Sequence, residues 1–60
     1  MNAVEVQEHA RRMWENLGPK AIARAAQQAR AFEQQGKSGE AKDWRRIEDA
    51  LKLLNGPAVS

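Results

Sequence analysis

Side chains able to carry out covalent chemistry are scarce in this sequence. It has no cysteine, threonine or tyrosine, so its hydroxyl groups are those of Ser38 and Ser60. Ser38 stands before Gly39 at an expected helix start, where a serine serves as a cap. A nucleophile also needs a neighbouring base, which neither serine is expected to have. We therefore predict no nucleophilic catalytic residue and expect that the protein is not an enzyme.

The remaining candidates for acid–base or metal chemistry are carboxylates and one histidine. Glu5 and Glu8 form one pair of carboxylates, and Glu48 and Asp49 form another. Each pair lies among basic residues on an expected solvated face, whereas acid–base catalysis needs a shielded site. His9 follows Glu5 by one turn, but a zinc site needs further ligands, which only a second chain could add. We interpret His9 as covering the edge of a helix interface, and predict no metal, cofactor or small-molecule substrate.

Basic side chains offer a second kind of chemistry, the binding of nucleic-acid phosphates. The sequence has ten lysines and arginines against eight acidic residues, a net charge of +2. Most of the cations on the expected third helix have an acidic neighbour within one turn, which weakens their attraction to a phosphate backbone. Nucleic-acid binding is therefore kept as an alternative function, for which the candidate residues are Lys20, Arg24, Arg30, Arg45 and Arg46.

Three amphipathic segments must position these side chains, and the first begins at a capping box. Asn2 and Glu5 have the spacing at which one side chain caps the first turn and the other reaches back. Apolar residues then recur at helical spacing. Gly18 and Pro19 end the segment, because glycine tolerates a left-handed conformation and proline lacks an amide donor. We expect a helix near residues 3–17.

Two further helices are expected to form an antiparallel hairpin. An alanine-rich segment near residues 19–35 ends at Gly36. The most regular apolar stripe follows near residues 39–54, with Ser38 as its cap. A connection this short makes antiparallel neighbours of the helices that it joins. The first helix is expected either to fold back on this hairpin or to reach across to a second subunit.

Alanines on the second segment are expected to let its neighbours approach closely. One face of this segment is formed by Ile22, Ala25, Ala26, Ala29 and Phe32. Trp14 and Trp44 are expected to pack above this face, because large side chains fit over small ones. On the third segment, opposite charges at helical spacing are expected to pair, Arg45 with Asp49 and Glu48 with Lys52 among them.

Bulky apolar side chains are few for a chain of 60 residues. A domain of this size buries only about 60% of the surface that it exposes when unfolded, and commonly needs a disulfide, a metal or association. Association is the expected solution here. Apolar residues off the main faces indicate that some apolar surface is left over; these are Val4, Ala21, Ala50 and Leu53. The interface residues that we predict are Met13, Trp14, Leu17, Phe32, Trp44, Leu51 and Leu54.

The segment Glu40-Ala41-Lys42-Asp43-Trp44-Arg45-Arg46-Ile47 carries a resemblance. Together with the alanine-rich segment and glycine turn before it, it resembles a group of short uncharacterised bacterial helical proteins that share Glu-Ala-x-x-Trp-Arg-Arg-Ile. The resemblance covers about residues 17–57 and implies a compact helical protein, without assigning an activity or a functional residue. The turn from Phe32 to Trp44 is also similar to helical turns of tetratricopeptide-type proteins, although their full pattern is missing.

The sequence thus predicts an all-α fold in one domain of residues 1–57, with a disordered tail at 58–60. The predicted function is a non-enzymatic interaction module, a homodimer or an adaptor that docks through apolar helix faces. The alternatives are a small nucleic-acid-associated regulator and an antitoxin-like peptide that folds on its partner. No apolar run reaches the ~20 residues that span a bilayer. We therefore expect a cytoplasmic protein without membrane contact.

Overall fold

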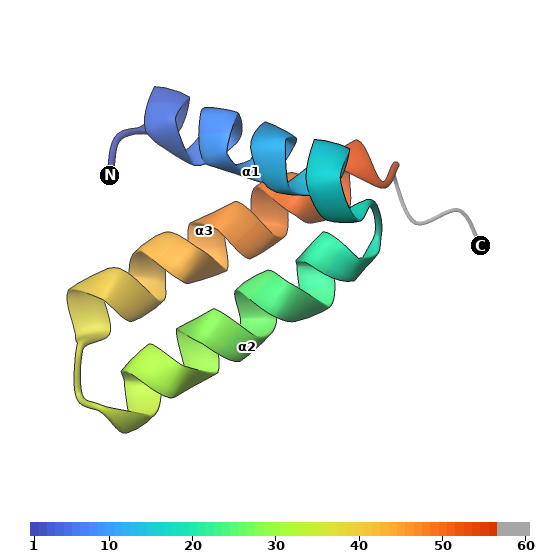
Figure 1. Cartoon of the computed structure of the whole chain (residues 1–60). Helices are drawn as coiled ribbons and strands as arrows, with labels where there is room; N and C mark the ends of the chain where they lie inside the picture. Colours follow the sequence, from blue (N-terminus) through green and yellow to red (C-terminus); the bar gives the residue numbers. More distant parts are fainter. Residues whose placement is uncertain (57–60) are drawn as a thin grey trace.

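The computed structural model describes residues 1–56, which form three α-helices. These are α1 (Ala3–Leu17), α2 (Lys20–Gln34) and α3 (Ser38–Leu54), shown in Figure 1. The all-α prediction is confirmed, and each helix end lies within one residue of its predicted position. The tail predicted at residues 58–60 lies outside the described residues.

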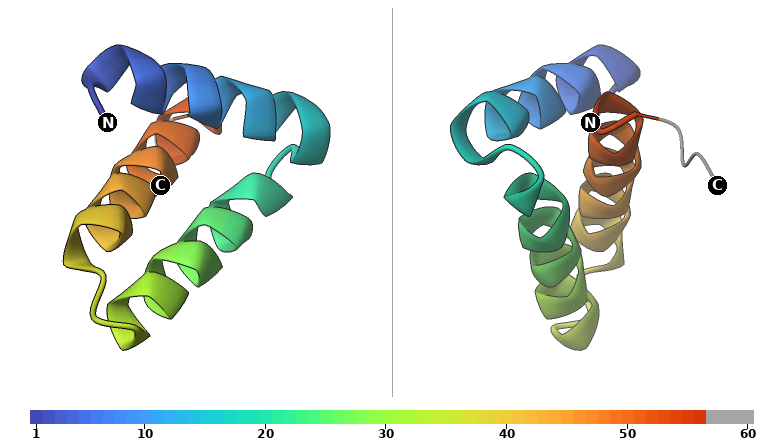
Figure 2. Two further views of the ribbon diagram at one scale, coloured as in Figure 1. Left: turned by 60° about the vertical axis from the view of Figure 1, so that its left-hand side comes forward. Right: turned by 90° about the vertical axis from the view of Figure 1, so that its right-hand side faces the viewer.

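The hairpin of α2 and α3 is antiparallel and contains most of the contacts between helices (Figures 1 and 2). α1 lies across the open end of this hairpin, where α2 begins and α3 ends. It packs more on α3 than on α2. Of the two arrangements expected for the first helix, the structure shows the one in which it folds back on its own hairpin.

The helix ends follow from local residues, with one exception. At α1 the capping box is formed: the backbone amide of Glu5 donates to Asn2 Oδ1 at 2.8 Å, and that of Asn2 donates to Glu5 Oε1 at 3.2 Å. α2 ends at Gln34, and two residues later the positive φ of Gly36, 77°, lets the Lys37 amide donate to the Phe32 carbonyl at 2.9 Å. The exception is Ser38, which is the first residue of α3 and makes no capping hydrogen bond. Lys37 occupies the cap position instead, because the helix resumes directly after this turn.

The core is built from alanines and few large side chains. Ala21, Ala25 and Ala29 form a fully buried row along α2, and Ile47 and Leu51 are the only large side chains of residues 1–56 without exposed surface. Placing Ala21 outside the core was wrong, because residues four apart stack on one helix face and this row faces the neighbouring helices. α1 adds Val6 and Ala10 to the core. Across residues 1–56, no helix is both long and apolar enough to traverse a membrane.

Candidate interaction surface

The residues predicted for an interface fall into three classes of exposure. Met13, Trp14 and Trp44 are half-buried and pack against the core, and Phe32 is half-buried as well. Leu17 and Leu54 are exposed at 43% and 41%. Leu51 differs from the expectation: it has no exposed surface, because it packs among the buried residues of all three helices. It belongs to the core of the single chain and is not available to a partner.

The largest apolar exposure lies where the outer faces of α1 and α3 meet. Val4 on α1 is 66% exposed and Leu53 on α3 is 77% exposed. Two hollows adjoin Leu53, and Gln7 lines both: one of about 130 Å³ also includes Leu54, and one of about 340 Å³ also includes Ala3. Val4 lines neither of them, but it shares a hollow along α1 with Gln7. We call this region the α1–α3 surface; it is formed by Ala3, Val4, Gln7, Arg11, Ala50, Leu53 and Leu54.

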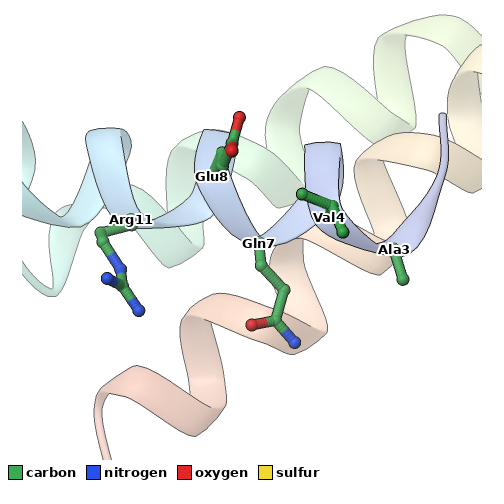
Figure 3. A pocket seen from close by; sticks show the side chains of 5 residues that line it. All are labelled: Ala3, Val4, Gln7, Glu8 and Arg11. Carbon is green, nitrogen blue, oxygen red and sulfur yellow. The ribbon is translucent and has the colours of Figure 1, made fainter.

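A third hollow, of about 430 Å³, extends this surface along α1 (Figure 3). Its lining residues are Ala3, Val4, Gln7, Glu8 and Arg11. Figure 3 shows Gln7 and Arg11 pointing to the same side of α1, and Glu8 pointing to another. Because small or aliphatic groups form one end of this hollow and polar side chains the other, it could accept an apolar side chain beside a polar one.

Four charged side chains border the α1–α3 surface. Glu8 and Arg11 stand on α1, and Arg46 and Asp49 stand on α3. Their formal charges cancel. Arg46 also donates a hydrogen bond to the carbonyl oxygen of Met1 at 3.4 Å, which connects α3 to the start of α1. The surface thus combines apolar residues with Gln7 and Arg11, and the four charged side chains in and beside it have no net charge.

His9 holds α1 against α3 on another side of the molecule. It is half-buried, and its ring meets the Trp44 ring edge-on, with the ring centroids 5.1 Å apart and the planes at 78°. This is a favourable geometry for two aromatic rings. His9 covers the edge of a helix interface, as we interpreted it from the sequence. Within residues 1–56, no group of three or more His, Asp or Glu residues is arranged to hold a metal ion.

Arg45 joins α3 to α2 through a network of ion pairs. Its Nε and Nη2 atoms donate to the two carboxylate oxygens of Glu33 at 3.1 and 3.0 Å, and Nη1 donates to Glu48 Oε1 at 3.0 Å. The predicted pair of Glu48 with Lys52 is present at 3.6 Å. The predicted pair of Arg45 with Asp49 is replaced by this network, because the hairpin brings Glu33 within reach of a bidentate contact.

The five basic residues of the nucleic-acid alternative are not brought together. Lys20 and Arg24 line a hollow of about 270 Å³ at the start of α2. Arg30 and Arg45 both lie near Glu33, where Arg45 is held by carboxylates. Arg46 lies at the edge of the α1–α3 surface. A phosphate backbone would therefore meet three separate small groups, one of which is already neutralised.

The hydrogen bonds from Arg45 lower the pKa of Glu33 below its ordinary value, partial desolvation opposes this effect, and the charges of Arg45 and Arg30 add to it. A carboxyl group whose pKa is lower in the folded state stabilises the fold above its unfolded pKa. That stabilisation is lost as the pH falls through the folded pKa. The pair is exposed, so its contribution is small.

We therefore expect Glu33→Gln to lower the thermal midpoint slightly near neutral pH, with a difference from wild type that vanishes on acidification. Thermal unfolding followed by circular dichroism from about pH 7 to about pH 3 measures this. Glu15→Gln, an exposed substitution on α1, is the control, since its partners are not those of Arg45. A Glu33→Gln effect of the same size at both ends of the pH range would contradict the pairing.

Comparison of the sequence with protein-family models, with curated proteins and with solved structures finds no match. The resemblance of the Trp44-Arg45-Arg46-Ile47 segment to short bacterial helical proteins therefore stays a prediction.

Proposed function

We propose that this protein is a non-enzymatic interaction module that docks another polypeptide through the α1–α3 surface, as a homodimer or an adaptor. The observation that carries the proposal is the exposure of Leu53, at 77%, and of Val4, at 66%, beside hollows that share Gln7. Large aliphatic side chains that gather on one face mark sites of association more often than scattered ones do.

Energetics support the same conclusion. Burying a valine or leucine side chain that was exposed contributes about 1.5–3 kcal/mol. Only Ile47 and Leu51 supply that contribution in full among the large side chains of residues 1–56. A partner that covers Val4, Leu53 and Leu54 would therefore contribute a stabilising free energy comparable with that from burying the largest residues of the core. The half-buried Trp14 and Trp44 are already packed against the core, so the α1–α3 surface has more to gain from a partner.

The nucleic-acid alternative receives less support. Counterion release needs several cations that act on one backbone, whereas the candidate residues lie in separate groups and Arg45 is paired with two carboxylates. Titration of a labelled duplex or single strand at low salt separates the two functions. Binding that weakens steeply as salt is added would favour the nucleic-acid function over the one proposed.

Capture from a lysate of the native cell tests the proposal. Full-length protein on a resin should retain one or more polypeptides, copies of itself included. We expect Leu53→Ser and Val4→Ser to reduce what is retained, and Ala23→Ser, an exposed substitution on α2, to retain it unchanged. Identical retention by all four proteins would contradict docking through the α1–α3 surface.

A further inference from the structure

We propose that the polypeptide that covers the α1–α3 surface is a second copy of this chain, related to the first by a two-fold axis. This inference rests on the proposed function and names its partner. It predicts a symmetric dimer in which α1 and α3 of each copy contact α1 and α3 of the other. The hairpin tip, between α2 and α3, stays outside the interface.

The shape of the surface is suited to self-association. A two-fold interface uses one patch twice, so the patch must contain both a projecting group and a place to receive it. Leu53 is the projecting group, since it is the most exposed large apolar side chain of the described residues. The hollow along α1, lined by Ala3 and Val4 at its apolar end, is the place to receive it. At about 430 Å³, this hollow has room for a leucine side chain.

The charges at the edge of the surface point to the same partner. Glu8 and Asp49 balance Arg11 and Arg46, so the surface has no net charge to repel a second copy. A two-fold rotation onto itself can place acidic groups of one copy near basic groups of the other. A nucleic acid or an anionic lipid surface would instead favour a patch of net positive charge.

The area required is within reach of so small a chain. A standard interface covers about 800 Å² on each partner. The whole chain exposes 4471 Å², so a standard interface would need less than a fifth of its surface. Residues 3–11 of α1 and 46–54 of α3 provide two adjoining helix faces for this purpose. Because the apolar part is modest, we expect a dimer that dissociates on dilution rather than an obligate one.

Sedimentation equilibrium of the full chain over about 1 µM to about 1 mM tests the oligomeric state. We expect wild type to pass from monomer to dimer across this range. Leu53→Ser should raise the dissociation constant about a hundredfold, because the symmetry places each substitution twice in the interface. The helical circular dichroism of Leu53→Ser should equal that of wild type, since Leu53 lies outside the core.

Single cysteines identify the face that associates. The chain has no cysteine, so each disulfide formed by a single-cysteine variant must join two chains. On mild oxidation, an equimolar mixture of Gln7→Cys and Leu53→Cys should give the mixed covalent dimer as its main product. Gln34→Cys, an exposed position near the hairpin tip, is the matched control and should stay largely monomeric.

The outcomes are distinguishable from a failure of the proposed function. Wild type that stays monomeric up to the highest concentration overturns the second-copy proposal. A dimer that survives Leu53→Ser, or that crosslinks as well through Gln34→Cys, overturns it too, because another face must then associate. In either case, capture of a different polypeptide that depends on Val4 and Leu53 would leave the interaction module in place.

Discussion

Replacing Leu51 by alanine should destabilise the protein by about 2–5 kcal/mol, which is a large part of the stability of so small a domain. Leu51 has no exposed surface, and it belongs to the cluster to which all three helices contribute. The substitution removes buried methyl groups from that cluster and leaves a cavity that the surrounding side chains fill only in part. Urea unfolding followed by circular dichroism at low protein concentration measures the change.

Leu53→Ala is the matched control for this prediction. It makes the same chemical change two residues later, at a side chain that is 77% exposed. In the monomer, its effect should stay within about 0.5 kcal/mol. Equal costs for the two substitutions would contradict the assignment of Leu51 to the core and of Leu53 to the docking surface.

Ala25→Leu should destabilise the monomer by about 1–3 kcal/mol, because an enlarged side chain in a filled core displaces its neighbours. Ala25 is fully buried within the alanine row of α2, which is the helix that shares most contacts with α3. The extra atoms can be accommodated only if α2 and α3 move apart. The loss of stability is measured by urea unfolding, with the near-ultraviolet signal of the two tryptophans as a second probe of packing.

Ala23→Leu provides the control, since Ala23 lies on the exposed side of the same helix. Both residues have the same intrinsic helix propensity before and after substitution, so any difference between the variants reports packing. A stable Ala25→Leu variant with an unchanged near-ultraviolet spectrum would show that the interface of α2 and α3 is looser than the structure indicates.

Helix ends were predictable from the sequence because neighbouring residues determine them. Asn2 and Glu5 hydrogen-bond to each other's backbone in the capping box of α1. Gly18 and Gly36 both have positive φ, the conformation that ends a helix without steric strain. The hairpin of α2 and α3 followed from the shortness of its connection. Ser38 was assigned wrongly by one position, since a cap depends on backbone geometry that residue type alone does not fix.

Packing was harder to predict, because it depends on how each helix is rotated about its axis. The sequence pattern centres the apolar stripe of α2 one row of side chains away from the row that is buried. Ala21 is therefore predicted to lie outside the core, whereas the structure buries it fully. Leu51 was correctly placed on an apolar face but assigned to a partner. Which apolar residues a chain buries within itself depends on where α1 crosses α3, and no local pattern encodes that crossing.

Contacts between helices were missed for the same reason. Glu33 and Arg45 are twelve residues apart and meet only because the hairpin brings them together. Val4 and Leu53 are both predicted to lie off the main faces, but no local pattern indicates that they line hollows with a shared residue, Gln7. Gln7, which lines all three hollows of that surface, was not identified. The only sequence signal for Gln7 is its helical spacing, because it follows Val4 by three residues and precedes Arg11 by four.

The central claim is that one chain completes its own small core and leaves the α1–α3 surface to be covered by association. The most direct test is the dependence of the urea midpoint on protein concentration, for wild type and for Leu53→Ser. We predict that the wild-type midpoint rises between about 1 µM and about 1 mM, because only the folded state associates, and that the Leu53→Ser midpoint does not. Midpoints that are independent of concentration and equal for both proteins would contradict the claim.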